Sequence, residues 1–152
     1  MSILSWLKQV TTGSKDELMP SKDMQFAANE QEFHGLDMKS ALDAHLAWTH
    51  RLEDQMHGTA SEELEVGTVA SDCNCVLGKW IHGDAKARLS HMPEYKELKQ
   101  IHAEFHLTAG EILHKIQSNP GETTISLKPI QHKSGAVQLA LVRLYAKAQE
   151  AE

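Results

Sequence analysis

The sequence has few cysteines, no cluster of positive charge and no long apolar run, and each absence excludes a class of protein. Its two cysteines, Cys73 and Cys75, are one residue apart, so a disulfide between them would close almost no loop and would add little stability. Such thiols in a reducing compartment indicate metal or redox chemistry instead. The 15 Lys and Arg against 21 Asp and Glu give a formal net charge of -6. Without a basic cluster, we expect no nucleic-acid partner.

Apolar runs are short throughout the chain. None approaches the roughly 20 residues that a helix needs to span a bilayer. The N-terminal segment MSILSWLKQV has no basic region before its short, interrupted apolar part, as a secretion signal would have. We therefore expect no membrane span and a cytoplasmic location.

What the sequence does contain is enough for one domain. Its 152 residues are 41% hydrophobic and 24% charged, ordinary proportions for one globular unit with a modest core. Residues 1–34 are mixed, largely polar and interrupted by Gly13 and Pro20, so we expect a partly ordered tail there. The domain itself is expected over residues 35–150.

Hydrophobic spacing within residues 35–150 predicts three long amphipathic helices. The first runs from an N-cap at Asp37 to Gly58, the second from Pro93 to about residue 118, and the third from about residue 126 or 130 to residue 147. Between them, a loop is expected over residues 58–74 and a compact apolar turn over residues 75–83, and residues 84–90 allow a short helix. The predicted fold class is all-α, an up-and-down four-helix bundle.

Histidine is abundant, with 10 in the chain, and it is the commonest metal ligand in proteins. His102 and His106 are four residues apart, so both lie on one face of the second helix and can reach one ion. His45 lies within the apolar stripe of the first helix, where it can face that pair, and Cys75 adds a thiol. Taken singly, each histidine can also be a hydrogen-bonded core residue, and Cys75 a small buried hydrophobe.

Three imidazoles and one thiolate together suit tetrahedral zinc. Structural zinc sites surround the ion with four protein ligands, whereas a hydrolytic site keeps one position for water. The set His45, Cys75, His102 and His106 therefore favours a closed, structural Zn²⁺ site.

The segments that carry these residues are His45–Trp48 (HLAW), Cys75–Trp80 (CVLGKW) and His102–His106 (HAEFH). In residues, order and separation they resemble the chemoreceptor zinc-binding domain family, CZB, over roughly residues 36–118. The resemblance implies that zinc is ligated by His45, Cys75, His102 and His106. It implies a four-helix bundle that is often dimeric. It also implies a sensory or regulatory role beside bacterial chemoreceptors and diguanylate cyclases. The signal would be zinc or, through the zinc-bound cysteine, oxidants such as hypochlorous acid.

Several alternatives remain open. The chain contains no signalling coiled coil or cyclase segment, so we expect a stand-alone member that acts through its own dimer or a signalling partner. We expect no enzyme, because a zinc hydrolase would need a base such as Glu104, which points away from the flanking histidines on a helix. A hemerythrin-like diiron carrier would need bridging carboxylates instead of a thiolate. A purely structural zinc domain stays open, and Cys73 is either a redox helper of Cys75 or an incidental loop thiol.

Overall fold

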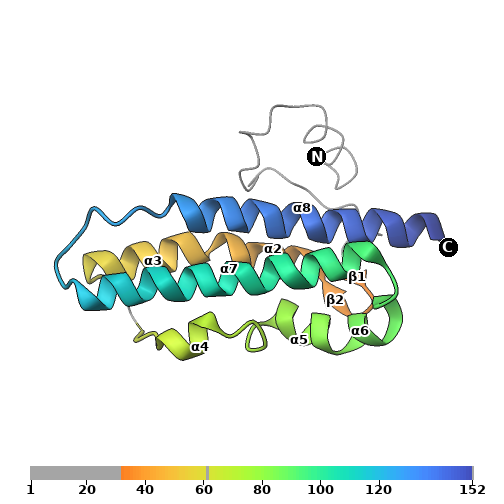
Figure 1. Ribbon diagram of the computed structural model, residues 1–152, viewed down its shortest axis with the longest axis horizontal. Helices are drawn as coiled ribbons and strands as arrows, with labels where there is room; N and C mark the ends of the chain where they lie inside the picture. Colours follow the sequence, from red (N-terminus) through yellow and green to blue (C-terminus); the bar gives the residue numbers. More distant parts are fainter. Residues whose placement is uncertain (1–31, 61, 152) are drawn as a thin grey trace.

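The computed structural model describes residues 32–60 and 62–151, and helices dominate this part of the chain (Figure 1). Their bounds are α2 Met38–Leu46, α3 Trp48–His57, α4 Val66–Ala70, α5 Val76–His82, α6 Asp84–Leu89, α7 Pro93–Ser118 and α8 Lys128–Ala151. Two short strands, β1 Glu32–Phe33 and β2 Leu36–Asp37, pair antiparallel before α2. The predicted all-α fold class is confirmed, and most of the expected tail lies outside the described residues.

Helices α2 and α3 form one almost continuous rod, which corresponds to the first predicted helix. Asp37 caps it as expected, because its carboxylate accepts a hydrogen bond from the backbone N–H of Ser40 at 3.0 Å. Ala47 separates the two helices but keeps right-handed helical dihedrals, and its N–H donates to the carbonyl of Asp43 at 3.0 Å. The rod ends at Gly58, in the left-handed conformation that commonly follows a helix.

Helices α7 and α8 are the longest in the described chain and pack along each other (Figure 1). The first residue of α7 is Pro93, as predicted, since a proline at this position sacrifices no intrahelical hydrogen bond. Apolar side chains on the two helices, such as Leu113 and Leu141, are completely buried. Each such side chain contributes about 1.5–3 kcal/mol through its burial, so this pair supplies a large part of the core.

A row of three short helices, α4, α5 and α6, forms the remaining side of the bundle. The row runs along α7, on the side away from α8 in the view of Figure 1. Helix α4 lies so close to α7 that a Cβ on Gly110 would be 2.8 Å from the Cβ of Ala70, an approach that only glycine allows. The expectation of a loop over residues 58–74 and a turn over residues 75–83 was wrong where α4 and α5 form. Short helices are marginal in isolation and form here because they pack on α7.

A short hairpin anchors the start of the described chain to the core. The ring of Phe33 is buried and lies edge-on to Tyr145 of α8, with centroids 5.3 Å apart. The carbonyl of His34 accepts a hydrogen bond from the indole N–H of Trp80 at 3.0 Å. Two residues that the sequence analysis assigned to the tail therefore pack on the domain.

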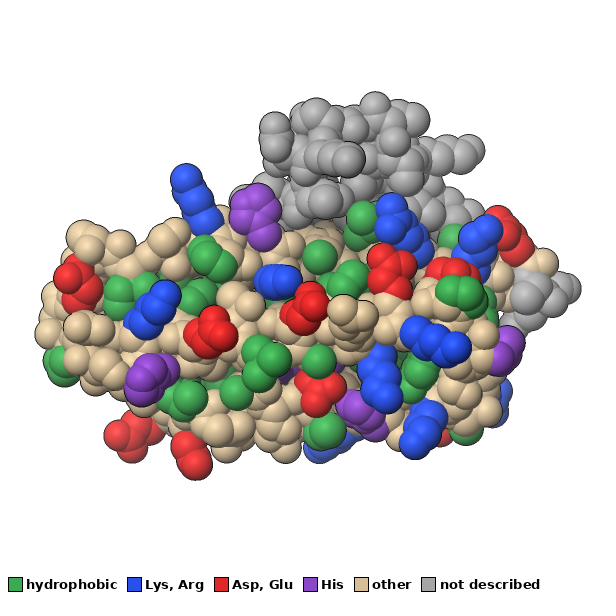
Figure 2. Space-filling view, in the orientation of Figure 1, with side chains coloured by type: hydrophobic (Ala, Val, Ile, Leu, Met, Phe, Trp, Pro, Cys, Tyr) green, Lys and Arg blue, Asp and Glu red, His purple; other side chains and the backbone are tan. Residues whose placement is uncertain are grey.

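Charged side chains of both signs are interspersed on the face shown in Figure 2. Within the described ranges, no helix combines the length and the apolar character needed to cross a membrane.

Candidate metal centre

Four side chains from three separate elements converge inside the bundle. His45 comes from α2, Cys75 from the N-cap of α5, and His102 and His106 from α7. Their ligand atoms all lie within 4.8 Å of one another, and none of the three histidines is more than 2% exposed. The structure thus brings together every residue that the sequence predicted as a zinc ligand.

Four of the six distances between these atoms are close to the edges of a zinc tetrahedron, and all six are below 4.8 Å. The Nε2 of His102 lies 3.1 Å from that of His45 and 3.2 Å from that of His106. The Sγ of Cys75 lies 3.2 Å from the Nε2 of His102 and 3.5 Å from the Nε2 of His106. With Zn–N about 2.0 Å and Zn–S about 2.3 Å, the edges are roughly 3.3 Å between nitrogens and roughly 3.5 Å between nitrogen and sulfur. Both the donor types and their spacing therefore fit zinc.

Hydrogen bonds to backbone carbonyls fix how two of the rings face the centre. The Nδ1 of His45 donates to the carbonyl of Ala41 at 2.8 Å, and the Nδ1 of His106 donates to the carbonyl of Val69 at 2.9 Å, because a carbonyl oxygen can only accept. In the neutral rings, each Nε2 then carries a lone pair directed at the centre. A single N–H on His102 can satisfy only one of these lone pairs, so the group as a whole is built to receive a cation.

Burial controls the charge of all four groups. Desolvation lowers the pKa of His45 to about 4 and that of His102 to about 2, and it also lowers the pKa of His106. The three imidazoles are therefore neutral at pH 7 and free to coordinate. Burial raises the pKa of the Cys75 thiol and outweighs the hydrogen bond that its Sγ accepts from the backbone N–H of Gly78 at 3.2 Å. Metal coordination opposes this effect, because it stabilises the thiolate.

Gly78 lets α5 and its preceding loop approach α7. A Cβ at this position would lie 1.7 Å from the carbonyl oxygen of Asp72 and 3.2 Å from the Cε1 of His102. A side chain here would therefore push the loop away from the ring. The glycine of the CVLGKW segment thus places Cys75 within reach of the two histidines of α7.

The other chemically interesting residues lie outside this group. The carboxylate of Glu104 accepts hydrogen bonds from Lys133 at 3.1 Å and from Gln100 at 3.4 Å, so it is engaged with α8 and with its own helix. Cys73 is exposed, and its Sγ lies 3.6 Å from the Oδ1 of Asp72. Neither cysteine forms a disulfide.

Two residues that support the centre were missed in the sequence analysis. Val69 acts through a backbone carbonyl, which leaves no side-chain pattern to find. Ser134 of α8 is buried, and its hydroxyl donates to the carbonyl of His45 at 3.2 Å. A small polar residue beside the apolar stripe of the last helix was the available signal.

The comparison with known families agrees with this geometry. Residues 45–113 match the family model described as the chemoreceptor zinc-binding domain. This segment is a CZB domain. The match begins at His45 and includes Cys75, His102 and His106, while most of the hairpin-to-α2 region and all of α8 lie outside it. No curated protein and no solved structure gives a significant match to the chain.

The CZB assignment establishes the class of ligand and of function. A CZB domain binds zinc, and this one contains a cluster of three histidines and one cysteine that can hold the ion. The prediction of zinc as the cofactor is therefore confirmed. CZB domains are regulatory modules associated with chemoreceptors, so the chain carries a zinc-binding regulatory module.

Proposed function

We propose that His45, Cys75, His102 and His106 are the zinc ligands of this CZB domain, and that the domain senses oxidants through Cys75. The observation that carries the proposal is the convergence of three histidine nitrogens and one cysteine sulfur. Neighbouring atoms in this group are 3.1–3.5 Å apart. When bound, zinc supplies the positive charge that keeps Cys75 as a thiolate, the form that oxidants attack.

Cys75 is the ligand that a small oxidant can reach. It is partly exposed, whereas the three histidines are buried. A surface pocket of about 450 Å³ is lined in part by Trp48, Asn74, Cys75 and His106. Of the four proposed ligands, Cys75 is the one with substantial exposure to solvent, because His106 is only 2% exposed and the other two histidines are no more exposed.

Oxidation of Cys75 would break one of the connections, through the metal, between the row of short helices and α7. A two-electron oxidant such as hypochlorous acid transfers its oxygen atom to the thiolate sulfur, and sulfenic acid and chloride result. The sulfur then loses its negative charge and becomes a poorer ligand. Because Cys75 caps α5, the N-terminus of that helix is the part expected to loosen.

A second copy of the chain or a signalling partner is proposed to receive the change. The apolar residues of the last helix, including Val137, Leu141 and Leu144, are already buried in the single chain, so they offer no dimer surface. Trp6 and Leu7, apolar residues near the N-terminus that could also contribute to a dimer surface, lie outside the described residues. The dimer therefore rests on the family resemblance alone. A purely structural zinc domain is the competing function, and the response to oxidant distinguishes the two.

Zinc content and hydrogen exchange test the proposal together. The parent should retain one tightly bound zinc per chain and release it to a colorimetric chelator after stoichiometric hypochlorous acid. Amide exchange should then increase over residues 66–82 more than in α7 and α8. His114→Ala changes an exposed residue of α7 and should behave as the parent. Sulfenic acid formation at Cys75 with full retention of zinc and unchanged exchange would refute sensing and leave a structural zinc domain.

A further inference from the structure

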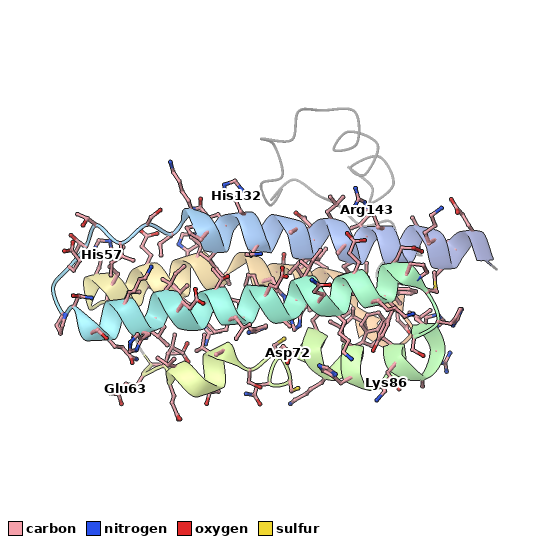
Figure 3. All side chains as sticks on the ribbon, viewed as in Figure 1. His57, Glu63, Asp72, Lys86, His132 and Arg143 are labelled. Carbon is pink, nitrogen blue, oxygen red and sulfur yellow. The ribbon has the colours of Figure 1, made fainter. Side chains whose placement is uncertain are left out.

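A second group of metal-binding side chains lies on the surface near the zinc centre. The ligand atoms of Asp72, Cys73 and His82 all lie within 4.8 Å of one another. Asp72, labelled in Figure 3, belongs to the connection between α4 and α5. Cys73 follows it in the same connection, and His82 is the last residue of α5. None of the three belongs to the buried set of four, so the group is separate from it.

The contacts within this group join three different donor types. The Nε2 of His82 lies 2.9 Å from one carboxylate oxygen of Asp72, and the Sγ of Cys73 lies 3.6 Å from the other. The side chains of His82 and Asp72 are 33% and 24% exposed, and Cys73 is exposed. Imidazole, thiolate and carboxylate are the ligands that zinc takes in proteins, and three of them leave a position for water.

The backbone holds these side chains in a fixed arrangement. The carbonyl of Asp72 rests against Gly78, where even a Cβ would lie 1.7 Å from it. The side-chain amide of Asn74 donates to the carbonyl of Thr68 at 3.2 Å and so ties the connection to α4. The group therefore needs only a small side-chain adjustment to surround an ion.

Nearby charge indicates that this site is weaker than the buried centre. Lys86, Lys96 and Lys99 line the surface pocket that also contains Asp72, and their charges oppose cation binding. Solvent access also weakens electrostatic attraction relative to the buried site. Asp72 and His82 are already in hydrogen-bond contact, and Cys73 is the member that makes the group selective for zinc over calcium or magnesium.

We propose that Asp72, Cys73 and His82 form a second, solvent-accessible zinc site that passes the ion to the buried centre. The transfer rests on the proposed function of that centre, whereas the site itself does not. Cys73 and Cys75 have one residue between them in the sequence. The carbonyl of Asp72 and the ring of His102 both lie beside Gly78, because a Cβ at that position would be 1.7 Å and 3.2 Å from them. The transfer is a ligand exchange without oxidation: Cys75 gives up its proton as it replaces Cys73, which takes up one from solvent.

Cobalt(II) tests the site in the full chain after the buried centre has been filled with zinc. A cobalt–thiolate bond gives a charge-transfer band in the near ultraviolet, and Cys73 is then the thiol free to form it. We expect this band in the parent, with a second metal ion bound at least tenfold more weakly than the first. Cys73→Ser should lose the band, and His82→Gln should weaken cobalt binding at least tenfold. His91→Gln replaces an exposed histidine outside the group and should match the parent.

Two outcomes would contradict the surface site. Absence of the band in the zinc-filled parent overturns the site, and so does an equal band in Cys73→Ser, since the sulfur would then be Cys75. Circular dichroism confirms that each surface variant is folded.

The rate of zinc uptake tests the transfer of zinc to the buried centre separately from the existence of the surface site. Zinc-free parent and Cys73→Ser should reach the same tight zinc content, with uptake about tenfold slower in the variant. Equal rates together with an intact cobalt band overturn the transfer and support the site. If the buried centre itself were wrongly assigned, the parent would retain no tight zinc while the band from Cys73 still formed, so the two failures give different results.

Discussion

The Nδ1 of His106 donates a hydrogen bond to the carbonyl of Val69 at 2.9 Å. One ring of α7 thereby contacts the metal centre through one nitrogen and the short helix α4 through the other. Partners of this kind fix the orientation of a ligating histidine. Cys75 makes the corresponding connection at the start of α5. The state of the centre is therefore coupled to the position of both α4 and α5 on the bundle.

Replacing one buried histidine should remove tight zinc. We expect His102→Ala to lose the ion, because three remaining ligands leave the shell open and an inward lone pair unmatched. Zinc at 1,000 times its dissociation constant stabilises a folded protein by about 4 kcal/mol, so this variant should lose stabilisation of that order. Elemental analysis and denaturant unfolding with and without a chelator measure both effects.

His114→Ala is the matched control for this change. His114 lies on the same helix but is exposed, so its replacement should leave zinc content and unfolding unchanged. Equal zinc content in His102→Ala and His114→Ala would contradict the ligand assignment.

Adding one methyl group at Gly78 should displace the loop that carries Cys75. Because a Cβ there would lie 1.7 Å from the carbonyl oxygen of Asp72, Gly78→Ala must move the backbone. Overpacking of this kind costs about 1–3 kcal/mol, and zinc affinity should fall with it. Zinc-competition titrations check this, with Gly67→Ala as the control, since a Cβ at Gly67 meets only the Glu65 carboxylate at 3.9 Å. Parental zinc affinity in Gly78→Ala would show that the close approach is unimportant.

Acid should destabilise the zinc-free protein over a pH range that is set by the pKa values of the buried histidines. Burial lowers the pKa of His45 to about 4 and that of His102 to about 2, whereas both titrate near 6.5 in an unfolded chain. The unfolded state therefore binds protons first, and stability falls as the pH drops below about 6.5, down to about 4 for the contribution of His45 and about 2 for that of His102. Above about pH 6.5 both rings are neutral in either state, and their contribution is constant.

Urea unfolding of chelator-treated protein at several pH values measures this dependence. His45→Gln should show a shallower loss of stability with acid than the parent, because the replaced ring no longer takes up a proton on unfolding. His114→Gln should keep the parental slope. Parallel slopes for all three proteins would exclude the buried rings as the cause.

If Cys73 has a redox role, the protein should recover from oxidation of Cys75 slowly, and the rate of recovery should depend on pH. Desolvation and the Asp72 carboxylate raise the pKa of Cys73, so at neutral pH it is a thiol that attacks a sulfenic acid on Cys75 slowly. If Cys73 forms a disulfide with Cys75, recovery of the parent after hypochlorous acid and reductant should be faster at pH 8.5 than at pH 7. Cys73→Ser should instead accumulate sulfinic acid at Cys75, as mass spectrometry would show. Recovery equal to the parent at both pH values would assign Cys73 no resolving role.

The family resemblance predicts a symmetric dimer. Sedimentation velocity of the zinc-bound chain at micromolar concentration should give twice the 16.9 kDa of one chain. Sedimentation as a monomer across that range would remove a second copy as the recipient of the signal and leave a partner of another kind.

Local sequence patterns were sufficient to predict the long helices and to single out the four residues that cluster inside the bundle. The segments 38–57, 93–118 and 128–151 are long enough for the spacing of apolar residues to indicate helices, although the ends of the last one were not fixed by it. Asp37 and Pro93 mark helix starts for local steric and hydrogen-bonding reasons. His102 and His106 meet because helical geometry brings residues four apart together. Donor chemistry, spacing and the family resemblance together therefore indicated zinc.

The short helices, the hairpin and the surface group could not be predicted from local sequence patterns, because they depend on tertiary packing. Helices α4 and α5 span five and seven residues, too few to be stable alone, so their conformation depends on packing against α7. Asp72 and His82 are ten residues apart in sequence and meet only because α5 folds back beside the preceding loop. The bond from His106 to Val69 uses a backbone oxygen, which every residue possesses. Contacts of this kind have no side-chain signature, because the fold, and not the residue type, places the atoms together.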